Sequence, residues 1–371
     1  MHALYIGLMS GTSMDGVDAA LCEFEDTRFV RVVASHSVHY PDDLRARLLH
    51  LQRDTPAIPL RDYAELNRKV AETFVLAVAG LLKQQRIDPA KIVAIGSHGQ
   101  TVFHDPSGVR SSLQAGDPNL IAADTGITTV ADFRRRDIAL GGQGAPLVPA
   151  FHHALFAAAG EQRCVVNIGG IANITLLDGD DLAHVRGFDT GPGNGLMDEW
   201  TQRHLGRPYD ADGAWAASAA NADEEFLAVL LADDYFRAPP PKSTGRDRFN
   251  LNWALSRYPQ LAALDPAAVQ RSFCELSARS IADMMRSRSP QACRVLICGG
   301  GARNGFLMRR LHELLKPVPV EPTDRHGLDA LHVEAAAFAW LAMRTLHGLS
   351  GNLPAVTGAR QAAVLGGIYR A

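Results

Sequence analysis

The sequence predicts an α/β protein of two similar halves, each with a mixed sheet flanked by helices. Hydrophobic periodicity gives candidate strands in the first half at residues 4–8, 17–24, 29–36 and 92–96, and helices at 42–51 and 63–82. The second half repeats the order, with candidate strands at residues 164–168, 171–177, 181–187 and 295–298. Three meandering strands followed by alternating helices and strands predict a mixed sheet with right-handed parallel crossovers.

The composition is that of a globular protein long enough for two domains. The chain has 371 residues, of which 47% are hydrophobic. A net charge of −3 gives no general attraction to nucleic acid or to an anionic membrane. The 5 cysteines include no C-x-x-C pair, which favours reduced thiols over disulfides or zinc. Because neither an export signal nor a membrane-spanning run is apparent, we expect a cytoplasmic protein.

The glycines and the proline of residues 141–146 interrupt both hydrophobic periods and mark a domain boundary. We therefore expect a first domain over residues 1–138 and a second over 139–371. Whether residues 353–371 return to the first domain is left open.

The most informative segment is residues 5–18, where Gly, Ser, Thr and Asp separate two apolar runs. This pattern is typical of a tight turn between strands whose backbone N–H groups face an anion such as phosphate. Its carboxylates would repel phosphate, so we expect them to serve a hydrated Mg²⁺ shared with a nucleotide. The alternative is a Gly-rich hairpin with Asx turns. The predicted nucleotide contacts are Gly11, Thr12, Ser13, Met14, Asp15, Gly16, Val17 and Asp18.

Two Gly-rich turns open the second half. The first, at residues 167–170, occupies the matching hairpin position and allows close backbone approach to a phosphate. In the second, Asp189 is expected to end a strand before a glycine turn and a helix over residues 196–204. A carboxylate there is a candidate general base, although a turn cap is the alternative. The predicted nucleotide contacts are Asn167, Gly169, Gly170, Gly191, Gly193 and Asn194.

A third glycine turn follows the strand at residues 295–298, and the next strand ends near Glu321. This is close to the dinucleotide fingerprint, but Asn304 stands where the third glycine should be. A nicotinamide-dependent dehydrogenase is thus an alternative, which binding of NAD rather than ATP would identify. The predicted nucleoside contacts are Gly299, Gly300, Gly301 and Asn304.

A second substrate has three candidate segments. His98 lies in a segment, residues 97–101, that is expected to end a strand, where α/β sheets bind ligands. Arg134 and Arg135 offer planar donors for a carboxylate, and Glu334 begins an alanine-rich helix. The alternatives are a buried histidine with satisfied hydrogen bonds, arginines paired with neighbouring aspartates, and an acid that complements a helix N-terminus. Ser10, beside the first loop, is a further candidate.

Several of these motifs resemble one family. The segment G-L-M-S-G-T-S-M-D-G-V-D (residues 7–18) and the segment D-T-G-P-G-N (residues 189–194) are similar to those of the anhydro-N-acetylmuramic acid kinases, within the sugar kinase, Hsp70 and actin superfamily. The resemblance extends from Ile6 to about Phe338. It implies a duplicated actin-like ATPase (ribonuclease H-like) fold with the active site in the interdomain cleft. Met9 stands where the superfamily has a carboxylate that serves the metal, so the metal ligands are unknown: Asp15, Asp18 or residues elsewhere.

The resemblance also implies a reaction. It uses ATP and Mg²⁺ to open the 1,6-anhydro ring of 1,6-anhydro-N-acetylmuramic acid and to phosphorylate O6. The products are N-acetylmuramic acid 6-phosphate and ADP, in peptidoglycan recycling and amino sugar catabolism. Asp189 would be the catalytic base, and the turn at Gly299 would hold adenosine. The implied sugar contacts are Ser10, His98, Arg134, Arg135, Asp189 and Glu334.

Two further functions fit the sequence less well. A non-catalytic ATP-driven clamp of the Hsp70 or actin type is disfavoured because the chain lacks an appended substrate-binding domain. A serine hydrolase is disfavoured because residues 7–11 do not form G-x-S-x-G. The resemblance leaves a homodimer open.

Overall fold

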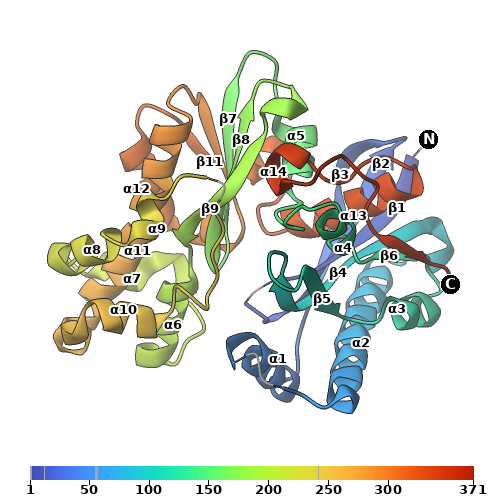
Figure 1. Ribbon diagram of the computed structural model, residues 1–371, viewed down its shortest axis with the longest axis horizontal. Helices are drawn as coiled ribbons and strands as arrows, with labels where there is room; N and C mark the ends of the chain where they lie inside the picture. The colour runs from blue at the N-terminus through green and yellow to red at the C-terminus, as the bar shows by residue number, and fades with distance from the viewer. Residues whose placement is uncertain (1, 12, 55–56, 241) are drawn as a thin grey trace. The chain divides into compact units, whose positions relative to one another are not determined.

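The computed structural model describes residues 2–11, 13–54, 57–240 and 242–371, and the chain forms two compact units (Figure 1). The first unit contains the chain up to Leu155 together with His332–Ala371, and the second is Phe156–Leu331. The expected boundary after residue 138 lies too early. Helix α5 (Pro149–Phe156) packs on the first unit, where the Phe151 ring contacts Phe29 edge to face at 5.4 Å and also contacts Trp340.

The first unit is built on a seven-stranded mixed sheet of order β12-β6-β4-β1-β2-β3, with β5 also paired to β4. Strands β1, β2 and β3 form an antiparallel meander, while β4 pairs with β1 and β6 with β4 in parallel. The chain end forms β12, which pairs with β6 and so returns to this unit. The strands are β1 (His2–Ser10), β2 (Gly16–Glu25), β3 (Arg28–His39), β4 (Ile92–Asp105), β5 (Ser111–Ala115), β6 (Thr129–Ala131) and β12 (Gly367–Tyr369).

The second unit repeats this topology in a five-stranded sheet of order β11-β10-β7-β8-β9. Strands β7 (Gln162–Ile168), β8 (Ile171–Asp178) and β9 (Arg186–Pro192) form the meander. Strands β10 (Arg294–Cys298) and β11 (Val320–Pro322) then add in parallel beside β7. The order β6-β4-β1-β2-β3 therefore has a counterpart in β11-β10-β7-β8-β9. This confirms the predicted fold class of two mixed sheets flanked by helices.

Two predicted strand ends are wrong. Residues expected to form a strand at 181–187 instead contain a short 3₁₀ helix (Leu182–His184), because the Asp181 side chain caps it. Strand β9 starts later and runs through Asp189. Likewise β4 continues beyond residues 97–101, because β5 supplies an antiparallel partner as far as Asp105.

Two glycines allow helix α13 (Val333–Leu346) to pack closely on the sheet of the first unit. Gly7 of β1 and Gly96 of β4 are paired neighbours in the sheet. A Cβ atom at Gly7 would overlap the backbone oxygen of Ala335, and one at Gly96 would overlap that of Phe338. The backbone of α13 thus lies directly on the sheet. The remaining helices of this unit are α1 (Asp42–Asp54), α2 (Leu60–Gln85), α3 (Pro118–Thr125), α4 (Arg135–Ala139) and α14 (Pro354–Thr357).

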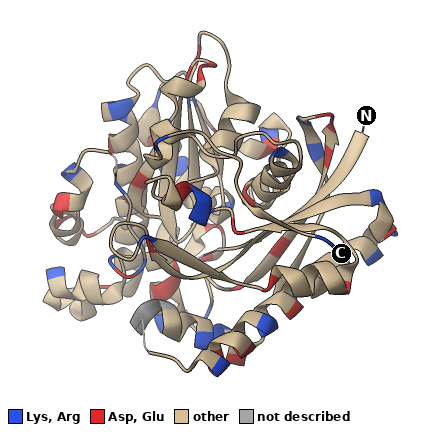
Figure 2. Ribbon diagram, turned by 45° about the vertical axis from the view of Figure 1, so that its right-hand side comes forward, with Lys and Arg blue, Asp and Glu red and all other residues tan. Residues whose placement is uncertain are grey.

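The second unit has its core around helix α11 (Pro266–Arg288), whose Phe273, Leu276 and Ile281 side chains are buried. Its other helices are α6 (Gly195–Leu205), α7 (Ala214–Ser218), α8 (Glu224–Leu231), α9 (Asp234–Arg237), α10 (Leu251–Arg257) and α12 (Gly305–Leu315). Figure 2 shows acidic and basic residues interspersed along the helices. Within the described residues, every helix is too short or too polar to cross a bilayer.

Candidate active site

Asp189 lies in strand β9 of the second unit, in a mostly buried position. The Thr244 backbone N–H donates to its Oδ2 at 2.9 Å. Burial raises the pKa of Asp189 to about 6, against the opposing effects of the Thr244 N–H and the Lys242 charge. A carboxylate with such a pKa is ionised at neutral pH and is basic enough to take a proton from water.

Three glycine-containing turns of the second unit meet at the carboxyl ends of β7 and β10. The N–H groups of Gly193 and Gly195 both donate to the Gly170 oxygen at 3.0 Å, and Asn194 N donates to Gly169 O at 2.7 Å. The Asn194 side chain donates to Ile168 O at 3.1 Å. These N–H groups donate within the turns and stabilise the turns themselves. Gly169 and Gly170 are partly exposed, so a ligand can reach their backbone.

Asn167 joins these turns to the third one. Gly299, with φ of +77°, has no Cβ, and one placed there would overlap Asn167 Oδ1. Asn167 Oδ1 is buried and has no hydrogen-bond partner within the described part of the chain. Asn304 caps helix α12 by accepting from Leu307 N at 3.0 Å. The structure thus brings together the predicted residues Asn167, Gly169, Gly170, Gly193, Asn194, Gly299, Gly300, Gly301 and Asn304, with Gly191 in the adjoining strand.

Glu321 bears on the dehydrogenase alternative. Its carboxylate pairs with Arg294 and accepts from His326 Nε2 at 3.1 Å. A dinucleotide fold needs this acid for the ribose hydroxyls. Arg325 Nη1 also lies 3.4 Å from Glu321 Oε1. Because Glu321 is held by three partners, the geometry favours a different nucleotide site.

In the first unit, residues 11–15 connect β1 to β2. Met14 N donates to Gly11 O at 3.2 Å, and the Met14 side chain is fully buried in the core with Val17. Asp15 pairs with Arg45 at 2.8 Å, and Asp18 accepts from Ser37 Oγ at 2.6 Å. Gly16 pairs with β3, Ser13 lies in the turn, and Thr12 lies outside the described residues.

A buried polar network holds three predicted substrate residues of the first unit. Burial and the Arg134 charge lower the pKa of His98 to about 3, so its ring is neutral. Its Nδ1 lies 3.2 Å from Ser10 O, and its Nε2 lies 2.7 Å from Arg134 Nη2. Because arginine only donates, Nε2 is the acceptor and Nδ1 carries the proton. Tyr40 completes the network by donating to Ser10 Oγ at 3.0 Å.

Arg134 and Arg135 have different surroundings. Burial lowers the pKa of Arg134 to about 10, while the charge of Glu334 raises it, so Arg134 stays charged at neutral pH. Arg135 is more exposed and pairs with Asp132 at 2.6 Å. The structure therefore associates Glu334 with Arg134, whereas Arg135 is engaged by its own neighbour.

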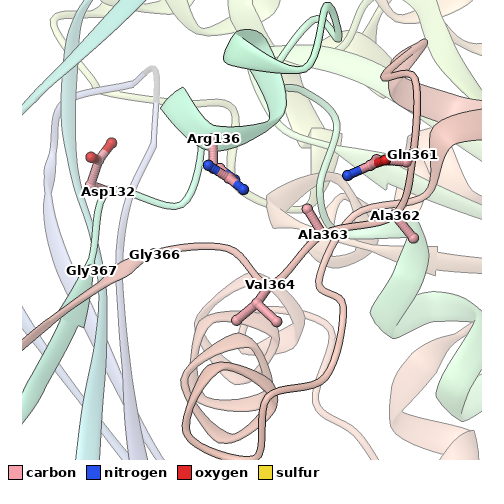
Figure 3. Close-up of a pocket in the computed structure, with 8 residues that line it drawn as sticks. All are labelled: Asp132, Arg136, Gln361, Ala362, Ala363, Val364, Gly366 and Gly367. Carbon is pink, nitrogen blue, oxygen red and sulfur yellow. The ribbon is translucent and has the colours of Figure 1, made fainter.

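Two cavities lie in the first unit. One of about 180 Å³ is lined by polar groups that include His98, Gln114, Arg135 and the buried Ser97, whose hydroxyl has no partner among the described residues. The other, of about 510 Å³, lies where the C-terminal segment passes helix α4. Figure 3 shows Arg136 and Gln361 pointing toward one another there. The smaller cavity contains more of the predicted substrate residues.

The sequence missed several residues around these sites. Lys242 and Thr244 border Asp189, and Tyr40 and Gln100 border Ser10. The Lys-Ser-Thr-Gly segment at residues 242–245 does not match a Walker A motif, because prolines stand where that motif needs glycine. Nothing else in this segment indicates from the sequence that it contacts Asp189.

Comparison with known proteins finds one family that matches nearly the whole chain. The sequence profile of the family "Anhydro-N-acetylmuramic acid kinase" matches residues 3–371. The chain is 49% identical to the protein of that name from Xanthomonas axonopodis pv. citri, over 99% of this chain and 98% of the relative. It is 48% identical to that of Coxiella burnetii, over 98% and 97%. A solved ROK family glucokinase from Streptomyces griseus is 16% identical, with a TM-score of 0.41 over 91% of this chain and 99% of that one.

Proposed function

Because the chain belongs to the anhydro-N-acetylmuramic acid kinase family, we propose that it phosphorylates 1,6-anhydro-N-acetylmuramic acid with ATP while opening the anhydro ring. The products are N-acetylmuramic acid 6-phosphate and ADP, and the role is in cell wall recycling. The observation that supports this proposal most directly is Asp189, a carboxylate with a raised pKa beside the glycine turns.

The chemistry needs one base. The oxygen of water bonds to the anomeric carbon as the bond from that carbon to O6 breaks, and the water proton passes to Asp189. The electron pair left on O6 forms a bond to the γ-phosphorus of ATP, whose bond to the ADP oxygen breaks. Since phosphoryl transfer neutralises O6, no second carboxylate has to protonate it, unlike in a glycosidase.

ATP is proposed to bind at the glycine-containing turns of the second unit, which Asn167 and Asn194 hold close to one another. Residues 169–170, 193–194 and 299–301 of the second unit would lie against the nucleotide, and residues 11–18 of the first unit would face its phosphates. Asn167 Oδ1, buried and unpartnered within the described residues, fits an acceptor for a water or nucleotide donor.

Mg²⁺ is proposed to accompany ATP, spreading the charge of its phosphates. Nowhere in the described residues do three or more His, Cys, Asp or Glu side chains cluster as a metal cage. Mg²⁺ often keeps several waters and takes one or two carboxylates together with phosphate oxygens. The exposed Asp15 and Asp18 fit that limited role, although Arg45 and Ser37 hold them here.

For the sugar, we propose contacts with Ser10, His98, Arg134, Arg135, Glu334 and Asp189.

Of the two arginines, Arg134 is expected to contribute more to sugar binding. Arg134→Met should raise the KM for the sugar by at least about tenfold, because a charge-assisted hydrogen bond contributes about 1.5–3 kcal/mol. Arg135→Met, the matched control, should change it less than about threefold, since exposed ion pairs contribute little. Steady-state kinetics at saturating ATP measure both. A larger effect of Arg135→Met would reverse the assignment.

The deciding experiment is mass spectrometry of the product formed from MgATP and 1,6-anhydro-N-acetylmuramic acid in ¹⁸O-labelled water. One added phosphoryl group and one labelled oxygen are expected. Phosphorylation without label would indicate an ordinary kinase that uses a free hydroxyl. No product, with NAD bound in preference to ATP, would favour the dehydrogenase alternative.

A further inference from the structure

We propose that the loop at residues 242–244 is a positioning segment for Asp189, fixing which carboxylate oxygen receives the proton and keeping that carboxylate ionised. The inference rests on the proposed role of Asp189 as the base. Thr244 contacts Asp189 although the two residues are separated by 55 positions in the sequence.

A closed set of hydrogen bonds joins the loop to the strand. Asp189 N donates to Lys242 O at 3.1 Å. Lys242 Nζ donates to Tyr235 O at 2.9 Å, and the Tyr235 hydroxyl donates to Asp189 O at 3.0 Å. The three hydrogen bonds therefore link Asp189, Lys242 and Tyr235 in a ring. The backbone of Asp189 is fixed on both its N–H and its C=O sides.

The carboxylate itself is held at one oxygen. Thr244 N donates to Oδ2 at 2.9 Å, and no hydrogen bond to Oδ1 occurs within the described residues. Accepting an N–H bond makes Oδ2 the less basic oxygen. The arrangement leaves Oδ1 as the oxygen that takes the water proton.

Lys242 contributes charge. Its ammonium lies 4.4 Å from the centre of the Tyr235 ring, a favourable position for a cation. Burial lowers the pKa of Lys242 to about 8, helped by the positive charge of Arg288 and opposed by Asp189. Arg248 lies over the same Tyr235 ring at 5.0 Å. Lys242 is therefore still mostly charged at pH 7, and it favours the ionised form of Asp189 without touching the carboxylate.

The test compares Lys242→Met with Lys242→Arg, which keeps the charge. The pKa of Asp189 is read from a ¹³C NMR titration of carboxyl-labelled protein, with the signal assigned by its loss in Asp189→Asn. Loss of the nearby charge should raise the titration midpoint by about one pH unit. The acid side of the kcat/KM profile should move by the same amount. In Lys242→Arg, the shift of each midpoint from its wild-type value should be at most half of the shift in Lys242→Met.

A superimposable titration in wild type and Lys242→Met would overturn the role of Lys242, even if kcat falls. The NMR midpoint does not depend on turnover, so it separates this failure from failure of the proposed function, which would appear as a wild-type protein that makes no phosphorylated sugar.

A second pair of variants tests the amide. Thr244→Pro removes the N–H that holds Oδ2, whereas Thr244→Ala keeps it. The midpoint should rise in the proline variant and stay near the wild-type value in the alanine variant. Equal midpoints in the two variants would overturn the role of the amide. If the proline variant does not fold, as judged by circular dichroism, the Lys242 pair alone decides the proposal. Ser243→Ala, at an exposed position of the same loop, controls for loop substitution.

Discussion

Replacing Asp189 by Asn is expected to leave ATP binding intact and to reduce kcat by about 100- to 10,000-fold, the usual contribution of a general base. Asparagine has nearly the same shape and can still accept from Thr244 N, but it cannot take a proton from water. Isothermal titration calorimetry with ATP and a coupled assay of ADP release give the two quantities. The control is Asp283→Asn, which removes an exposed carboxylate from helix α11 of the same unit. Substantial activity in the Asp189 variant would remove it from the role of base.

The raised pKa of Asp189 also predicts how Asp189→Asn changes the folding stability as the pH rises. The folded protein holds this proton up to about pH 6, whereas the ordinary carboxyl value is 3.8. Ionisation of Asp189 therefore costs folding free energy, and the cost grows from about pH 4 and is fully present above about pH 6. Asparagine lacks this cost. At pH 8 the Tm of Asp189→Asn should equal or exceed that of the wild type, so that lost turnover cannot be attributed to misfolding.

The same pKa gives the wild-type enzyme an expected pH profile. The base works when it is ionised, so kcat/KM should be half its maximum near pH 6 and fall about tenfold per unit below it. Titration of His98 should not affect kcat/KM in this pH range, because burial keeps its ring neutral down to about pH 3.

The features that the sequence predicted best are those with a local signal. Alternating strands and glycine turns identify both meanders. Asp189 is a candidate base because it precedes a glycine turn near the end of a predicted strand, and its catalytic role stays a prediction. The strand order follows from the repeated sequence of elements, since crossover rules leave few arrangements.

What the sequence could not predict depends on contacts between distant residues. The Lys242 loop has no motif of its own, and only tertiary folding brings it to Asp189. Met14 belongs to a glycine-rich turn, yet its side chain fills the core, because the turn has to anchor itself on apolar contacts. Helix α13 and strand β12 join the first unit from the end of the chain, and local periodicity does not reveal this return.

The second large effect is a loss of folding stability, which we expect for Gly96→Val because helix α13 packs directly on the sheet at this glycine. Valine suits a β-strand locally, so the cost must come from packing. Its side chain would occupy the space of the Phe338 backbone oxygen in α13, and a backbone atom in the middle of a buried helix cannot move aside alone. Overpacking commonly costs about 1–3 kcal/mol, and here we expect at least about 3 kcal/mol of unfolding free energy to be lost.

Urea denaturation measures this loss, and Val93→Ile, at a 44% exposed position of the same strand, should change stability by less than about 0.5 kcal/mol. Because α13 also carries Glu334, whose charge acts on Arg134, a displaced helix should raise the KM for the sugar in whatever fraction still folds. Wild-type stability in Gly96→Val would contradict the close approach of α13 to the sheet. A loss of stability without any change in KM would instead show that the sugar site does not depend on the position of Glu334.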